Sequence, residues 1–266
     1  MNQYFKKQII IALVWIIVLA IIVFVIYSIF SGTKKETCFD GIQNQTETGI
    51  DCGGPCKECE QIEAIKILNQ AFIPTVDNNY DLVAQIKNPN IYLGGEILNY
   101  EFDLYDNNDQ LIGTKTGNTY ILPQETKYIV EPRIFSEKIV SKMEFKIQNV
   151  SWKKLSAISN LEIRTKNIAY QKFDNSGKLV GFVENKTSYG LGTIEVVGIL
   201  FDVNNKIIAV SKTLMNTVLM NETRGFEMNW PYQIPSEVKS FDARAYTNIF
   251  LDENFIKGPD NLNSVE

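Results

Sequence analysis

Four cysteines are the residues of this chain whose type and spacing point most directly to chemistry. Cys38, Cys52, Cys56 and Cys59 fall within 22 residues, and no other cysteine occurs among the 266. An even number of closely spaced cysteines is typical of disulfides in an oxidising compartment, and we expect two, with three pairings possible. The alternative is a zinc site with four thiolate ligands, although the 13-residue first gap and the single C-x-x-C pair argue against it.

The same segment carries four oxygen-bearing side chains, Asp40, Asn44, Glu47 and Asp51. Carboxylate and amide oxygens are the ligands that calcium prefers, so these residues are the candidate calcium site. Their spacing differs from that of an EF-hand loop. In the alternative interpretation the segment is a covalent staple without metal, and the polar residues provide turns and solubility.

Catalytic chemistry is restricted by what the sequence lacks. The chain has no histidine, which excludes Ser-His-Asp and Cys-His catalysis and histidine-ligated metals. It also lacks the phosphate-binding, dinucleotide-binding and nucleophile-elbow motifs. We therefore expect no catalytic residue, no enzyme activity and no cofactor other than calcium. The net charge of −5 argues against binding of nucleic acid.

An apolar run near the N-terminus predicts a membrane anchor. Residues 9–30 contain no charge, glycine or proline, and as a helix they would span about 33 Å, enough for a hydrocarbon core of about 30 Å. A cleaved signal peptide is the alternative, but the run is too long and ends in bulky residues. Lys6 and Lys7 favour a cytoplasmic N-terminus, and the cysteines favour an extracytoplasmic C-terminal part. We thus expect a single-pass protein of the cell membrane.

Beyond residue 60, short apolar alternations separated by Asn, Asp, Gly and Pro predict an all-β architecture. Three phrases of the sequence then recur at an offset of 96 or 97 residues, which indicates two tandem copies of one domain. A period near 97 fits a seven-stranded antiparallel sandwich. The recurring pairs are 82–88 with 179–185, 104–112 with 200–208, and 122–126 with 219–223.

These observations predict a domain order along the chain. It comprises a cytoplasmic N-terminus (1–8), a transmembrane helix (9–30), a disulfide segment (31–60), a first β-sandwich (61–150), a linker (151–159), a second β-sandwich (160–256) and a disordered tail (257–266).

Two resemblances support this order. The segment from Cys38 to Cys59 is similar to a motif, C-x-D-G-x-x-N-x-x-E-x-x-x-D-C-G-G-x-C-x-x-C, of exported bacterial and archaeal surface proteins. Residues 102–106, Phe-Asp-Leu-Tyr-Asp, resemble the signature of the FxLYD family, close to the late-embryogenesis-abundant-like domains. That resemblance implies tandem immunoglobulin-like, extracytoplasmic sandwiches without catalytic residues. The second copy departs from the signature at residues 198–202.

One difference between the copies marks a candidate interface. The first copy has Glu101 and Asp103 on the outward face, which we expect to lie in water, where the second has Val197 and Ile199. A strand that is apolar on both faces is usually covered on both faces. The cover is either the linker or the neighbouring domain, or else a protein partner.

Two classes of function fit these expectations. The first is a membrane-tethered binding or scaffold protein of a prokaryotic cell envelope, whose sandwiches contact a protein partner. The second is an accessory subunit of a membrane-embedded secretion or pilus-type assembly, which would pack through its helix.

Overall fold

The structure is a computed structural model that describes residues 13, 15–25, 38, 46–48, 52–58, 62–155 and 161–256. The chain divides into two compact units, residues 1–61 and 62–266. In the first unit, residues 13 and 15–25 are helical. Among the described residues, no helix has both the length and the apolar character needed to cross a membrane. The predicted transmembrane helix over 9–30 therefore has no support in this part of the structure.

The first unit also contains the disulfide segment. Cys38 and Cys56 are joined, with an S–S distance of 2.07 Å, and Cys52 is disulfide-bonded as well. Cys59 lies outside the described residues. Gly53 has a φ of +80°, and a side chain there would meet the hydroxyl of Thr48 at 1.9 Å. The Cys-Gly-Gly sequence therefore supplies the positive φ and the space that this tight turn requires.

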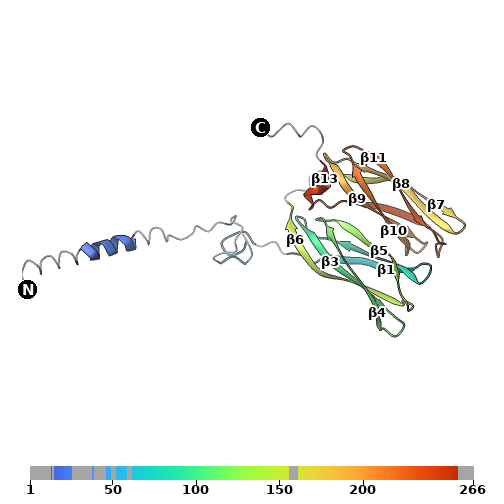
Figure 1. Ribbon diagram of the computed structural model, residues 1–266, viewed down its shortest axis with the longest axis horizontal. Helices are drawn as coiled ribbons and strands as arrows, with labels where there is room; N and C mark the ends of the chain where they lie inside the picture. Colours follow the sequence, from blue (N-terminus) through green and yellow to red (C-terminus); the bar gives the residue numbers. More distant parts are fainter. Residues whose placement is uncertain are drawn as a thin grey trace, which may run out of the picture. The chain divides into compact units, whose positions relative to one another are not determined.

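The second unit contains two β-sandwiches, each of two antiparallel sheets (Figure 1); three of the four sheets have three strands and one has four. In the first sandwich, one sheet has the order β1–β2–β5 and the other β4–β3–β6. These strands are β1 (Lys66–Pro74), β2 (Asn79–Lys87), β3 (Leu93–Tyr105), β4 (Leu111–Ile121), β5 (Thr126–Phe135) and β6 (Lys142–Lys154).

The second sandwich repeats this topology. Its sheets have the orders β7–β8–β11 and β10–β9–β12, and the short β13 also pairs with β9. The elements are β7 (Ile163–Phe173), β8 (Ser176–Asn185), β9 (Gly190–Phe201), β10 (Ile207–Val218), β11 (Thr223–Trp230), β12 (Ser240–Tyr246), the 3₁₀ turn η1 (Asp252–Asn254) and β13 (Phe255–Ile256).

The all-β class is confirmed, but the number of strands differs from the prediction. Each sandwich uses six long strands rather than seven, because individual strands of up to 13 residues take up the period. β6 also continues to Lys154, so residues 151–154 belong to the first sandwich and not to the predicted linker. Trp152 pairs with Gly95 of β3 in this extension.

Each sandwich has its own apolar core between its two sheets. In the first, the rings of Phe102 and Phe145 lie 4.8 Å apart, centroid to centroid, and Tyr100 packs against both. In the second, Trp230 is fully buried and its indole N–H donates to the carbonyl of Val210 at 2.9 Å. Alternation along the strands places these residues inward, as period-2 patterns require.

A buried asparagine explains one of the repeated phrases. The Asn88 amide, at the end of β2, donates to the carbonyl oxygens of Leu93 at 2.7 Å and Leu122 at 3.0 Å. The amide of Asn185, 97 residues later, donates to those of Tyr189 at 2.8 Å and Leu219 at 3.1 Å. Both asparagines are fully buried. They connect the loops at one end of each sandwich, so this repeat serves the fold.

The second repeated phrase forms the turn between two antiparallel strands. Oδ1 of Asp106 accepts the backbone N–H groups of Asn108 at 2.8 Å and Gln110 at 3.0 Å, between β3 and β4. Asp202 does the same for Asn204 and Lys206 between β9 and β10. Asp106, the last residue of the Phe-Asp-Leu-Tyr-Asp sequence, is thus a turn residue, and so is its counterpart Asp202.

Candidate functional site

The two sandwiches meet in a buried joint that contains the predicted interface residues. Val197 and Ile199 of β9 are fully buried there, in a cluster whose members come from both sandwiches. The first sandwich contributes Ile73, Val83, Tyr128 and Val130, and the second contributes Val197, Ile199, Ile207, Val210 and Tyr246. The neighbouring domain therefore covers the doubly apolar strand.

Strand β2 shows the matching pattern on the other side of the joint. Leu82 and Ala84 belong to the core of the first sandwich, whereas Val83 belongs to the joint, and all three are fully buried. A strand buried on both faces loses the polar alternation. The outer face of the β1–β2–β5 sheet is thus the surface on which the second sandwich packs.

Two hydrogen bonds cross the joint. The backbone N–H of Tyr128 donates to the hydroxyl of Tyr246 at 3.1 Å. The hydroxyl of Tyr232 donates to Oδ2 of Asp81 at 2.8 Å, while the N–H of Arg133 donates to Oδ1 at 2.9 Å. Burial raises the pKa of Asp81, against the effect of these two donors. Asp81 thus fixes a loop of the second sandwich to β2.

A buried lysine lies beside these bonds. Lys127 is 2% exposed, and its Nζ lies 3.3 Å from the ring centroid of Tyr120 and 5.1 Å from that of Tyr246. Burial lowers the pKa of Lys127 to about 8, although the carboxylates of Glu125 and Glu195 oppose this shift. The two aromatic faces supply the electrostatic partners of the ammonium group.

The segment after β12 adds an aromatic side chain to the joint. Phe250 is 7% exposed and lies against Tyr120, with ring centroids 6.5 Å apart. Lys153 lies 5.8 Å above the Phe250 ring. A Cβ at Gly94 would be 2.6 Å from the end of that ring, so the contact requires glycine. The sequence analysis missed Phe250, because it lies in an irregular segment without strand periodicity.

A pocket of about 460 Å³ opens at the joint. Its apolar walls include Ile91, Leu122 and Leu155 of the first sandwich and Leu161, Ile163 and Ala245 of the second. Glu125 and Tyr246 also line it. Burial raises the pKa of Glu125, partly offset by the nearby Lys127 and by the N–H of Leu122. Polar and apolar surface both line the pocket, and a pocket at a domain interface is a common form of ligand site.

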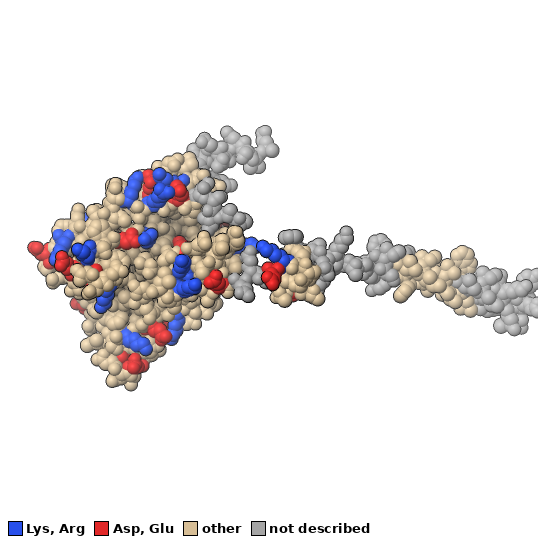
Figure 2. Space-filling view, turned by 180° about the vertical axis from the view of Figure 1, so that it is seen from behind, with Lys and Arg blue, Asp and Glu red and all other residues tan. Residues whose placement is uncertain are grey.

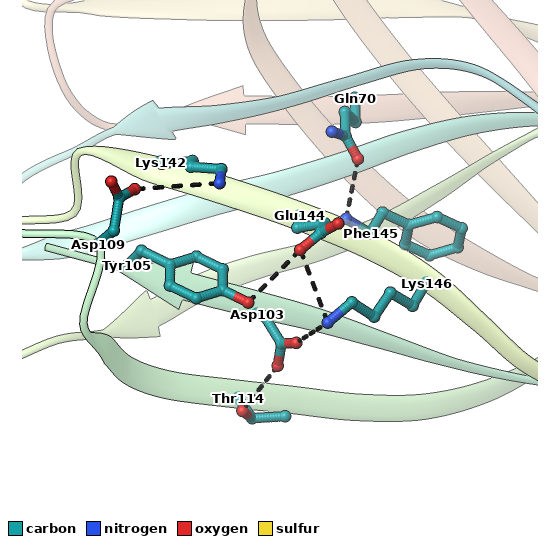
Figure 3. Close-up of polar contacts among 9 residues, drawn as sticks. All are labelled: Gln70, Asp103, Tyr105, Asp109, Thr114, Lys142, Glu144, Phe145 and Lys146. Carbon is teal, nitrogen blue, oxygen red and sulfur yellow. Dashed lines mark hydrogen bonds and ion pairs between the residues drawn. The ribbon is translucent and has the colours of Figure 1, made fainter.

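On the opposite sheet of the first sandwich, the outer face is polar. Asp103, predicted to face water, lies on this face but is only 4% exposed. Its carboxylate accepts hydrogen bonds from Nζ of Lys146 at 2.7 Å and from the hydroxyl of Thr114 at 2.9 Å (Figure 3). Burial acts to raise the pKa of Asp103, but Lys146 and Thr114 hold it below its usual value.

Other charges on this face are paired too. Glu144 accepts a hydrogen bond from the hydroxyl of Tyr105 at 3.4 Å and lies 3.6 Å from Nζ of Lys146 (Figure 3). Lys142 lies 3.9 Å from Asp109. On the face of the second unit that Figure 2 shows, charges of both signs are likewise mixed, without a large area of one sign. The polar face is an ion-paired surface rather than an arrangement for acid–base or nucleophilic catalysis.

The predicted calcium residues are described only in part. Glu47 is 9% exposed, and its Oε1 lies 3.2 Å from Sγ of Cys56. Cys38, Glu47 and Cys56 come together, but the two sulfurs are bonded to each other, so neither is a thiolate available to a metal. Asp40, Asn44 and Asp51 lie outside the described residues. Calcium binding by this segment stays a prediction.

Comparison with known proteins adds little to this geometry. No protein-family model matches the chain, and no curated protein matches it. Among solved structures, the crystal structure of red sea bream transglutaminase aligns with 70% of this chain at 10% identity and a TM-score of 0.24. The alignment covers 29% of the transglutaminase chain. A likeness at this level carries no argument about fold or activity.

Proposed function

We propose that this protein is a single-pass membrane protein of the cell envelope, whose two extracytoplasmic sandwiches bind or position a protein partner and do not catalyse a reaction. The joint between the sandwiches supports the second part of the proposal, that they bind or position a protein partner. Apolar contacts, two hydrogen bonds and the Phe250 contact hold the sandwiches in one arrangement. A fixed pair of domains presents loops and faces at constant spacing, which suits recognition and scaffolding.

The sequence supports the membrane anchor, through the 22 uncharged and mostly apolar residues of 9–30. The Cys38–Cys56 disulfide supports an oxidising location for the part that follows. Topology is tested by fusing alkaline phosphatase, which is active only outside the cytoplasm, after Glu266 and, in a second fusion, before Met1. We expect activity from the first fusion only. Activity from the second alone would refute the orientation, and with it the disulfide-based location.

An accessory subunit of a membrane-embedded secretion or pilus-type assembly is the second candidate. The described helix has exposed apolar residues, among them Trp15 and Phe24, and either lipid or another membrane helix would cover them. A pulldown from detergent, with and without residues 1–33, separates the two candidates. If the partners are retained without the helix, the sandwiches make the contact, as we propose. Loss of every partner on removal of the helix would favour the assembly subunit.

A further inference from the structure

The two sandwiches use an equivalent glutamate in two different ways. Glu125 and Glu222 each follow a strand turn, and Oε2 of each accepts a backbone N–H, from Leu122 at 2.8 Å and from Leu219 at 2.6 Å. In the second sandwich the other oxygen, Oε1 of Glu222, accepts hydrogen bonds from Nε and Nη2 of Arg224 at 3.0 and 2.7 Å. A guanidinium group therefore fits the second oxygen of this carboxylate.

In the first sandwich the position of Arg224 is occupied by Lys127. Its ammonium group lies over the ring of Tyr120 and thus does not reproduce the bidentate contact of the arginine. Glu125 instead lines the pocket at the joint. The two equivalent carboxylates thus accept the same kind of backbone hydrogen bond. Glu125 lines a pocket, whereas Glu222 contacts a guanidinium group.

The pocket has the size of a small-molecule site, and its lining is partly apolar and partly polar. Its volume of about 460 Å³ lies within the range of about 300–1,000 Å³ that is usual for ligand pockets. Apolar side chains of both sandwiches form part of the walls, including Leu155, Ile163 and Ala245. A ligand with an apolar body would bury that body against both domains, with its charged end at Glu125.

We propose that this pocket binds a small ligand with a planar cationic group, of the guanidinium or amidinium type, attached to an apolar body. The planar group would donate two N–H groups to Oε1 of Glu125, as Nε and Nη2 of Arg224 both do to Oε1 of Glu222. The ammonium of Lys127 lies over the Tyr120 ring, and its charge also acts on the Glu125 carboxylate. The proposal is independent of the membrane location and of the protein partner.

The test uses benzylguanidine as the probe and benzylurea as its neutral analogue of the same shape. Binding to the full-length chain is measured by isothermal titration calorimetry. We expect benzylguanidine to bind at least tenfold more tightly than benzylurea, because only the cation forms charge-assisted hydrogen bonds with the carboxylate.

Two variants test whether Glu125 is the residue that binds benzylguanidine. Glu125→Gln keeps an oxygen for the N–H of Leu122 but removes the charge, and we expect the affinity for benzylguanidine to fall at least tenfold. Glu222→Gln makes the same change in the second sandwich, where Arg224 already occupies the carboxylate, and should leave the affinity unchanged. Far-ultraviolet circular dichroism checks that both variants are folded.

Any of four results would overturn the proposal, of which the first three concern the probe and Glu125. Those three are the absence of heat from benzylguanidine at millimolar concentration, equal binding of benzylurea, and an unchanged affinity in folded Glu125→Gln. A loss of affinity in Glu222→Gln alone would also overturn it, since the site would then lie in the second sandwich.

Discussion

At the scale of single residues, Lys127 is the least expected feature of the joint. Nothing in its sequence neighbourhood distinguishes it from a surface lysine, since residues 122–126 precede it as an ordinary strand turn. It becomes buried because the second sandwich covers β5 and brings Tyr246 over it. A buried ammonium lowers stability unless its surroundings compensate the loss of water.

The lowered pKa of Lys127 predicts how stability depends on pH. The folded state loses this proton near pH 8, whereas an unfolded lysine keeps it to about pH 10.4. Between these values the unfolded state binds more protons, so the free energy of unfolding rises with pH. From pH 7 to pH 9 we expect a gain of about 1 kcal/mol, measured by urea denaturation.

Lys127→Met is the control for this pH dependence. The variant lacks the titrating group, so its stability should be flat between pH 7 and pH 9, and at pH 7 it should equal or exceed that of the parent. A parent protein whose stability falls over the same interval would contradict the assignment.

The buried asparagines give a second prediction at this scale. Asn185→Ala removes the donor to the carbonyl oxygens of Tyr189, Val218 and Leu219. Leaving buried carbonyls unpaired should lower the free energy of unfolding by about 3 kcal/mol. Asn229→Ala is the matched control, because Asn229 is exposed and bonds only to the side chain of Glu227. It should cost less than about 0.5 kcal/mol in the same denaturation experiment.

Residue roles were predictable only where a local pattern determines them. The end of the apolar strand before Asn88 and the turn at Asp106 follow from the sequence, since neighbouring residues form most of their contacts. Asp103 was expected to be solvated, because alternation gives the face but not the neighbours. Its burial depends on Lys146 and Thr114, which come from two other strands.

At the scale of elements, β9 shows how far pattern reasoning extends. Its doubly apolar sequence predicts cover on both faces, and the structure provides it from the first sandwich. The identity of the cover was not predictable, because it depends on how two separate sheets pack. The number of strands was not predictable either, because the length of a sequence repeat does not determine how many strands it forms.

The irregular segment after β12 provides the prediction at this scale. Phe250→Ala should remove an aromatic contact from the joint and lower the free energy of unfolding by about 3 kcal/mol. It should also weaken the coupling of the sandwiches, so that urea unfolding shows two transitions by tryptophan fluorescence. Phe135→Ala is the control, because Phe135 is an exposed phenylalanine of the first sandwich. A single transition with unchanged midpoint in Phe250→Ala would show that this residue does not hold the joint.

At the scale of the whole second unit, the joint is made by unlike faces. The β1–β2–β5 face of the first sandwich contacts the β9-containing sheet of the second. A contact between two different faces can repeat from molecule to molecule and form an open chain instead of a closed oligomer. In the first sandwich, the equivalent of that second face carries Asp103 and its ion pair with Lys146. The charges therefore keep this face from making the same contact with another molecule.

This arrangement predicts an outcome for surface variants. Glu101→Val combined with Asp103→Ile gives the first sandwich the residues of Val197 and Ile199. We expect concentration-dependent association, measured by sedimentation velocity, because the change removes the two carboxylates of this face and gives it the apolar residues that β9 uses in the joint.

The matched control removes the same charges without adding apolar surface. Glu101→Gln combined with Asp103→Asn should sediment as the parent does at every concentration. If the apolar variant also sediments as the parent, the ion pairs do not restrict association.

Covalent linkage changes what the joint has to achieve. Because both sandwiches lie in one chain, each meets the other at an effective concentration that short linkers set in the millimolar range. At that concentration a contact of modest intrinsic affinity is almost fully formed, so its composition is less restricted than that of an interface between free subunits. Such a joint tolerates a buried lysine between Tyr120 and Tyr246, which an interface between free subunits would accommodate less easily.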